Sequence, residues 1–243
     1  MNLKTRLIAC MKEDWKFPAH IDADTLAEEM KDALASPDGI LRDRLVLDGF
    51  GILVMSKKVK SEKIRTIFEE LVSDKFLLGG LGKEQDDSVF GRAFSGYGIL
   101  SLLEYGKGSM LFTKDDILRA YNAVLKCFRE EKDLRGYVDG KGWAHSIAHN
   151  ADCLAAFAAD NNLGHDELIA LLFAVKERVC QGHSKVISEY ERLLKSVMSV
   201  LERGLITEQE LAQWVNDICE YTITGNKEED ARNIMCRCEF MIL

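Results

Sequence analysis

The residue types best suited to chemistry gather in one segment, Glu131–Asp152, which reads EKDLRGYVDGKGWAHSIAHNAD. Within it, His145, His149 and Asp152 follow one another at spacings of four and three residues. Side chains at these spacings share one face of a helix. Imidazole changes its charge near neutral pH, and a neighbouring carboxylate can orient it for proton transfer. The pattern therefore predicts a helix with a polar face that is suited to binding or acid–base chemistry.

The charge distribution predicts where this helix lies. Between Lys141 and Asp160 the only formally charged residue is Asp152. A surface helix normally carries several charged residues on its outer face. We therefore predict a helix that includes Trp143–Asp152, is buried nearly all round and lies near the middle of the fold.

Three interpretations of the polar face remain open. The first is a buried hydrogen-bonded network that includes Arg92 or Arg135 and serves only the protein itself. The second is a cleft that binds a small polar or anionic ligand, or a peptide segment, because arginine side chains hold carboxylate or phosphate with paired hydrogen bonds. Its candidate ligand-binding residues are Arg92, Arg135, Asp139, Trp143, His145, His149 and Asp152.

The third interpretation is a metal site formed by His145, His149 and Asp152. The HxxxH spacing places two imidazoles on one helical face, where both could ligate one ion. Ser146 stands where HExxH metalloproteases have their catalytic glutamate, so that mechanism is excluded. No cofactor is required by the sequence.

The elements around this segment are predicted to be helices. The only prolines are Pro18 and Pro37, and apolar residues recur with a period of about 3.6. Helix starts are indicated by Ser36 before Pro37, by Ser61, and by capping-box pairs. These pairs are Thr113 with Asp116, Thr207 with Glu210, and Asn226 with Glu229.

About eleven helices with short connections favour one all-α domain over residues 1–243. Two helices in roughly every 40 residues are typical of stacked antiparallel helix pairs, an α-α superhelix of the HEAT or armadillo kind. A compact helical bundle is the alternative.

Composition limits the partners and the location. The net charge of −8 excludes generic binding to nucleic acid, which requires a basic surface. The longest stretch without a charged residue is Ala93–Leu103, far too short to cross a membrane. The first residues do not resemble a signal peptide, and seven cysteines without framework spacing favour a cytoplasmic protein.

Four stretches, in their order and spacing, resemble the bacterial domain of unknown function 2785 family. They are Ser36–Leu45, Asp86–Ser95, Glu131–Asp152 and Glu189–Leu193. The resemblance covers about residues 36–200 and implies an all-helical, superhelical cytoplasmic domain without an assigned activity. The characteristic positions of the family fall on Asp43, Arg92, Ser95, Asp133, Arg135, Asp139, Trp143, His145, His149, Asp152, Glu189 and Arg192.

We therefore expect an uncharacterised binding protein whose partner is a small polar ligand, a protein or a peptide. One alternative is an enzyme in which His145 or His149 is the general acid or base, oriented by Asp152 or Asp139, with or without a metal. The other is a structural scaffold in which the polar residues only rigidify the core.

Overall fold

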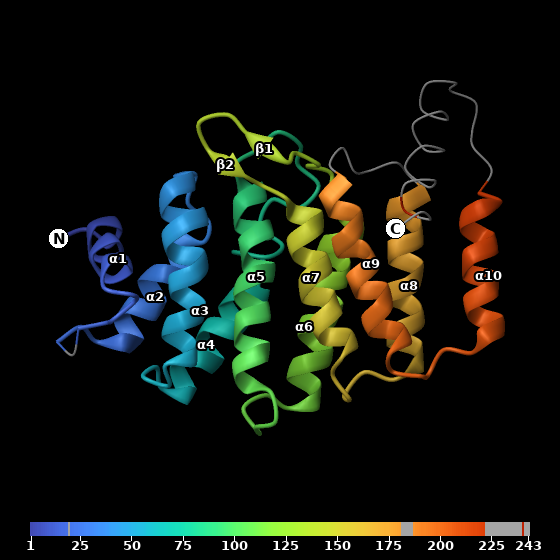
Figure 1. Cartoon of the computed structure of the whole chain (residues 1–243), viewed down its shortest axis with the longest axis horizontal. Helices are drawn as coiled ribbons and strands as arrows, with labels where there is room; N and C mark the ends of the chain where they lie inside the picture. Colours follow the sequence, from blue (N-terminus) through green and yellow to red (C-terminus); the bar gives the residue numbers. More distant parts are fainter. Residues whose placement is uncertain (19, 181–186, 222–239, 241–243) are drawn as a thin grey trace.

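Helices dominate the computed structural model, which describes residues 1–18, 20–180, 187–221 and 240 (Figure 1). The all-α expectation is confirmed, and the only strands among the described residues form one short hairpin. Asn226 and Glu229 lie outside the described residues, so the helix predicted there is not addressed. The described residues contain no helix that combines the length and the apolar character needed to cross a bilayer.

The elements follow one another in chain order. They are α1 (Leu3–Lys12), α2 (Ala23–Ala33), the π-helical segment η1 (Ile40–Val46), α3 (Leu47–Met55), α4 (Ser61–Val72), α5 (Ser88–Gly106), α6 (Lys114–Glu130), β1 (Tyr137–Val138), β2 (Gly142–Trp143), α7 (Ser146–Ala158), α8 (His165–Cys180), α9 (Ile187–Leu201) and α10 (Glu208–Cys219).

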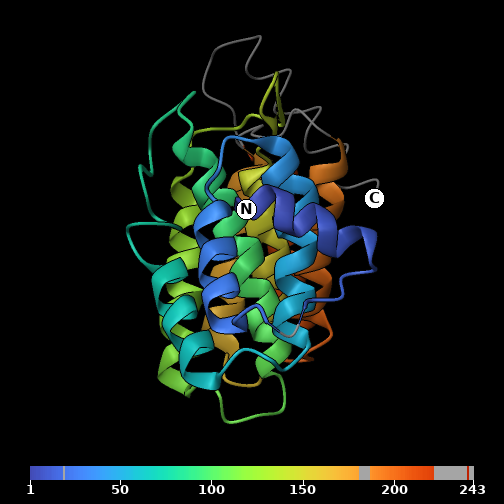
Figure 2. The same ribbon diagram turned by 90° about the vertical axis from the view of Figure 1, so that its left-hand side faces the viewer.

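The helices alternate between two layers. In one layer α3, α5, α7 and α9 lie side by side in that order, and in the other α2, α4, α6, α8 and α10 follow one another (Figure 1). From α3 onward the chain passes to the other layer at each connection, and α4 packs against α5, α6 against α7 and α8 against α9. The view in Figure 2, from the N-terminal side, places α1 and α2 in front of the later helices.

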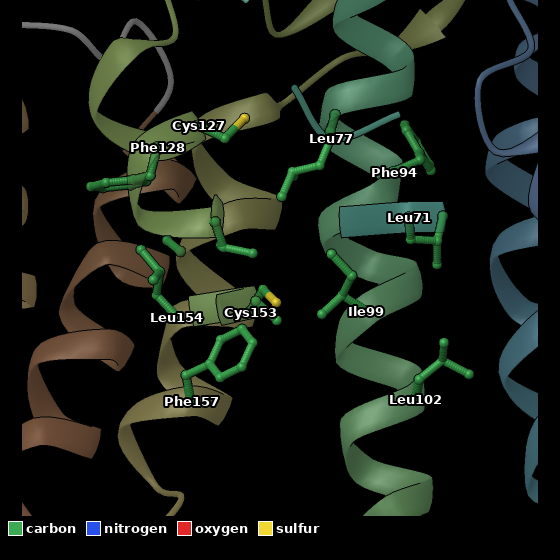
Figure 3. Close-up of a cluster of buried hydrophobic side chains, with 14 of the residues drawn as sticks. Leu71, Leu77, Phe94, Ile99, Leu102, Cys127, Phe128, Cys153, Leu154 and Phe157 are labelled. Carbon is green, nitrogen blue, oxygen red and sulfur yellow. The ribbon is translucent and has the colours of Figure 1, made fainter. Parts of the chain in front are cut away.

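Helix α7 occupies the middle of this arrangement, with α5, α6 and α9 packed against it. All of its residues except Ala156 are buried, as the absence of charge predicts. Figure 3 shows part of the apolar core here, where Cys153 and Phe157 of α7 lie on the side toward Ile99 of α5. At Gly96 the two helices approach so closely that an added Cβ would lie 2.6 Å from the amide oxygen of Asn150.

The predicted start of this helix is wrong. The helix begins at Ser146, whereas Trp143 lies on β2 and His145 adopts a left-handed backbone with φ 49° and ψ 38°. The chain reverses direction instead, because Gly140 and Gly142 take positive φ values of 71° and 84°. Glycine adopts such angles without the steric cost that other residues incur.

Of the predicted helix starts, two are confirmed with their caps, the one at Ser61 is confirmed without the serine cap, and the cap at Ser36 is wrong. Both Thr113 and Thr207 form complete capping boxes. Ser61, by contrast, is the first residue of α4 and makes no capping bond, since Lys60 is its N-cap. Upstream of η1 the side chain of Asp38, not of Ser36, accepts the hydrogen bond from the N–H of Leu41 at 3.1 Å.

Candidate functional site

The hairpin lies across one end of the helices, beside the start of α7 (Figure 1). Its two strands are antiparallel, with Tyr137 opposite Trp143. The fully buried Arg42 of η1 anchors it by donating hydrogen bonds to the carbonyl oxygens of Lys141 at 2.7 Å and Trp143 at 3.1 Å. The carboxylate of Asp43 accepts a hydrogen bond from the Trp143 N–H at 3.1 Å. Segment η1 thus fixes the backbone that carries Trp143.

Aromatic rings surround the guanidinium of Arg42. Its central carbon lies 4.0 Å from the ring centre of Phe90 and 4.7 Å from that of Phe94, which are cation–π distances. Burial lowers the pKa of Arg42, while the negative charge of Asp43, whose Oδ1 lies 2.7 Å from its Nε, opposes that shift. Arg42, which anchors the hairpin, is therefore packed against buried aromatic residues of the core.

Three contacts fix the position of His145. Its Nδ1 lies 2.8 Å from the carboxylate of Glu189 on α9. Its ring stacks on Trp143 with centres 4.5 Å apart and planes at 14°. Its backbone N–H donates to the carbonyl of Arg135 at 3.2 Å. A left-handed backbone costs a residue other than glycine on the order of 1 kcal/mol and persists only where the surroundings enforce it, which is frequent at functional sites.

His149 lies one turn further along α7 and is buried against α5. Its ring packs edge-on against Phe94, with centres 4.8 Å apart, and lies 6.2 Å from Tyr97. Its Nδ1 is buried without a hydrogen-bond partner among the described residues. Burial, with smaller contributions from the charges of Arg192 and His145, lowers the pKa of His149 to about 3. This imidazole is therefore neutral at pH 7, which does not fit the predicted role of general acid or base near neutral pH.

The buried, neutral state of His149 predicts that the protein loses stability as the pH falls. In the unfolded chain a histidine titrates near pH 6.5, so below that pH the unfolded state takes up a proton that the native state does not. With the native pKa at about 3, the contribution is complete above pH 6.5 and declines as the pH falls toward 3. Between pH 7.5 and pH 5 we expect a loss of about 2 kcal/mol from this residue.

Urea denaturation of the wild type and of His149→Gln at the two pH values measures this loss. The variant should lose less stability between pH 7.5 and pH 5 than the wild type by that amount. Equal losses in both proteins would show that His149 is protonated in the native state.

Asp152 does not orient the histidines. Its carboxylate forms an ion pair with Arg192 of α9 and lies 3.5 Å from the ammonium group of Lys195. Within the described part of the chain, no group of three or more His, Cys, Asp or Glu residues is arranged to hold a metal ion. The metal site predicted from His145, His149 and Asp152 is therefore not formed.

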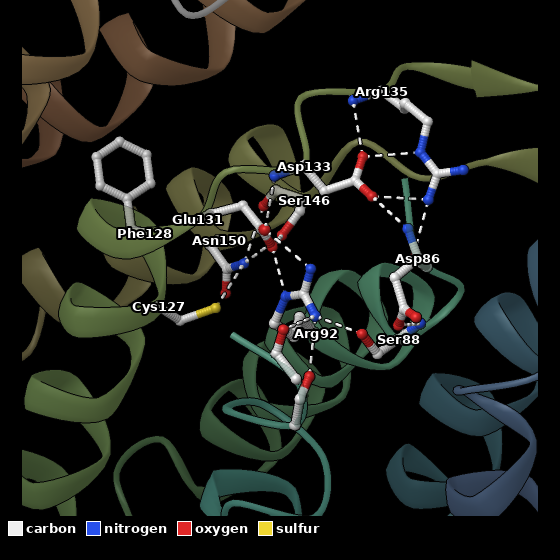
Figure 4. Close-up of polar contacts among 12 residues, drawn as sticks. Asp86, Ser88, Arg92, Cys127, Phe128, Glu131, Asp133, Arg135, Ser146 and Asn150 are labelled. Atoms are coloured by element: carbon white, nitrogen blue, oxygen red, sulfur yellow. Dashed lines mark hydrogen bonds and ion pairs between the residues drawn. The ribbon is translucent and has the colours of Figure 1, made fainter. Parts of the chain in front are cut away.

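Arg92, which is itself fully buried, belongs to a separate network of hydrogen bonds (Figure 4). Its guanidinium donates to both carboxylate oxygens of Glu131, at 2.7 and 2.9 Å. Its Nη1 donates to the hydroxyl of Ser88 at 2.8 Å and to the carbonyl of Gly79 at 2.9 Å. Glu131 also accepts a hydrogen bond from the hydroxyl of Ser146, the first residue of α7, at 2.8 Å. The side chain of Arg92 is thus occupied within the protein.

Arg135 and Asp139 also lie apart from the histidines. The guanidinium of Arg135 donates to both oxygens of the buried carboxylate of Asp133, at 2.8 and 2.7 Å, and to the carbonyl of Asp86 at 2.9 Å (Figure 4). Asp139 is exposed in the hairpin turn. The structure therefore brings together Trp143, His145 and His149 but not the full set of predicted cleft residues. For the two arginines it favours the internal network.

Three residues that shape this region were missed by sequence reasoning. Arg42 anchors the hairpin, Glu131 neutralises Arg92, and Tyr97 lies beside His149. The one available signal was the position of Arg92 next to the long uncharged stretch, since a buried arginine requires a carboxylate partner. Glu189 was named only as a characteristic position of the family, without a role.

Comparison with known proteins agrees with the resemblance seen in the sequence. Residues 77–241, more than half of the chain, match the model of a family described as "Protein of unknown function (DUF2785)". The match omits Ser36–Leu45, which the resemblance included, and extends through the C-terminal part that it left out. Searches of curated proteins and of solved structures gave no significant match.

Proposed function

We propose that this chain, which belongs to the DUF2785 family, is a binding protein that holds a small polar ligand or a peptide segment against Tyr137, Trp143 and His145. We call these three residues the hairpin surface. The observation that carries the proposal is the exposed Trp143 stacked on His145, whose ring is held by the carboxylate of Glu189. The two-layer helix order supports a superhelical scaffold of the HEAT or armadillo kind, and the free cysteines support a cytoplasmic location.

The aromatic rings of the hairpin surface are open to solvent. Trp143 is 45% exposed and Tyr137 is 60% exposed, and their rings meet edge to face with centres 5.2 Å apart. Tryptophan and tyrosine are the side chains that most often dominate binding energies, because they contribute a large contact area with little loss of conformational freedom. The hairpin that carries them is anchored to η1 through Arg42, so the surface is preorganised for binding.

His145 adds a directional contact. Glu189 occupies its Nδ1, and its Nε2 makes no hydrogen bond to the described residues. When Nδ1–H donates its hydrogen bond to the carboxylate of Glu189, a neutral His145 presents Nε2 as an acceptor. A ligand with a planar group could stack on Trp143 and, through a hydrogen-bond donor at the edge of that group, donate to Nε2 of His145.

One observation favours a second candidate function. The carboxylate-oriented imidazole of His145 has the geometry of a general base. In that enzyme Glu189, not the predicted Asp152 or Asp139, would be the orienting group. Binding and catalysis are separable, since a His145→Ala enzyme would retain its substrate but lose turnover.

Native mass spectrometry of gently purified protein, followed by a ligand-observed screen of small polar compounds and short peptides, tests the proposal. We expect Trp143→Ala to weaken binding of a retained or screened ligand by about 30-fold, as loss of a central aromatic contact does. The matched control is Phe173→Ala on α8, because Phe173 is 47% exposed and lies outside the hairpin surface. The proposal is wrong if no compound distinguishes wild type from Trp143→Ala, or if both variants weaken binding equally.

A further inference from the structure

A further cationic side chain lies deep in the molecule and outside the hairpin surface. Arg178 on α8 is only 4% exposed. Its Nε donates a hydrogen bond to the carbonyl of Phe128 at 2.7 Å, and its Nη2 donates to the same oxygen. Phe128 lies in the last turn of α6, where backbone carbonyls lack helical partners. Arg178 thus completes the end of that helix with two of its three nitrogens.

Among the described residues, no carboxylate lies within ion-pair distance of Arg178. The fully buried Arg92 differs in this respect, because it pairs with Glu131. The carboxylate with the largest electrostatic effect on Arg178 is that of Glu131, whose two oxygens already accept hydrogen bonds from Arg92, from Ser146 and from the N–H of Asp133. Burial lowers the pKa of Arg178 to about 10. The residue is still charged at pH 7, and a buried charge without a partner is costly.

A hollow of about 680 Å³ opens beside this side chain. Arg178 lines it together with Leu81, Arg129, Lys132 and Leu134. The remaining guanidinium nitrogen, Nη1, makes no hydrogen bond to the described residues, and it is not one of their fully buried side-chain atoms that lack a partner. This donor, unpartnered among the described residues, therefore belongs to a side chain that lines a space large enough for a small molecule.

The charged groups around the hollow limit what it can hold. Lys132 is exposed at the mouth and has no ion-pair partner in the described chain, whereas Arg129 is paired with Glu177 at 2.8 Å. Three carboxylates also line the hollow: Glu84 and Glu130, which are exposed, and the buried Glu131, whose charge Arg92 neutralises. A ligand with a single negative charge can reach Arg178 and Lys132 without strong repulsion. A multiply charged anion would be repelled by these glutamates.

We propose that this hollow, which we call the Arg178 hollow, binds a small molecule with one carboxylate group. The carboxylate accepts hydrogen bonds from Nη1 of Arg178 and from the ammonium group of Lys132, and the apolar part of the ligand lies against Leu81 and Leu134. Charge-assisted bonds of this kind are the strongest that a guanidinium forms. The site shares no residue with the hairpin surface, so the two proposals stand or fall separately.

Side-chain NMR tests the proposal with butyrate as the probe. Butyrate carries one carboxylate and a short apolar tail, and it replaces chloride stepwise at constant ionic strength. We expect the Arg178 Nε–Hε resonance to shift saturably, while the same resonance of Arg203 does not move. Arg203 is the matched control, because it also donates to backbone carbonyls of a helix end, those of Ala158 and Asp160, but lies outside the hollow. A linear shift, or equal shifts at both arginines, overturns the proposal.

Variants separate the site from folding. Arg178→Lys keeps a cation but loses the fork of nitrogens, and we expect butyrate to bind about tenfold more weakly. If that variant does not fold, the test uses Lys132→Gln, because Lys132 is exposed and its replacement should not affect folding. This variant should also weaken butyrate binding. Inorganic phosphate should compete poorly. Unchanged affinity in Lys132→Gln together with tighter binding of phosphate contradicts the proposed ligand class.

Discussion

Replacement of Arg92 by alanine is expected to lower the free energy of unfolding by about 3–5 kcal/mol. The change removes the positive charge that neutralises Glu131 and leaves that carboxylate fully buried between α5, α6 and α7. It also leaves the carbonyl of Gly79 and the hydroxyl of Ser88 without their donor. Breaking a buried ion pair on one side is costly because the remaining charge has no solvent to stabilise it.

Urea denaturation monitored by circular dichroism measures the loss. The control is Arg129→Ala, since Arg129 holds Glu177 with the same paired geometry at the surface, and it should cost less than about 1 kcal/mol. The double variant Arg92→Met/Glu131→Leu should recover much of the loss, because it removes both charges together. A cost for Arg92→Ala as small as that for Arg129→Ala would show that water reaches Glu131.

Replacement of Phe94 by alanine is the second change with a large expected effect, about 3–5 kcal/mol. Phe94 lies on α5 and is 1% exposed, and its ring centre is 4.7 Å from the guanidinium carbon of Arg42 and 4.8 Å from the ring centre of His149. Its removal leaves a cavity in the core and takes away a ring that contacts both side chains. Both the stability and the environment of His149 are expected to change.

Two readouts distinguish a cavity from a wider collapse. Phe94→Leu retains part of the volume and should cost less than half as much, whereas the exposed Phe173→Ala should cost little. Trp143 fluorescence should change in Phe94→Ala, because Arg42, which the ring covers, anchors the hairpin. If the stability loss equals that of Phe173→Ala, Phe94 is not part of the core.

The fold could be predicted from the sequence wherever the signal is local. The lack of charge around Asp152 placed α7 in the middle, and the spacing of Thr113 and Asp116 located the start of α6. Both signals depend on residues within a turn or two of one another. The helical class follows from the same periodicity.

The candidate site could be predicted only in part, because its geometry depends on residues distant in the chain. The spacing of His145 and His149 suggested one helical face. The positive φ of Gly142 and the hydrogen bond from Trp143 to Asp43 instead hold this segment in the hairpin, so the helix begins only at Ser146. The partner of Arg92 is 39 residues away, and no local pattern identifies it. Backbone reversals and long-range pairs of this kind are decided by tertiary packing.

The central position of α7 also bears on how the chain is made. A ribosome completes α7 before it has made α9, which covers one of its faces. Until Leu201 has been synthesised, the side of α7 that later meets α9 has no partner and is open to unwanted association. A chain that terminates between these two helices would keep that side exposed, which makes it a natural substrate for chaperones and proteases.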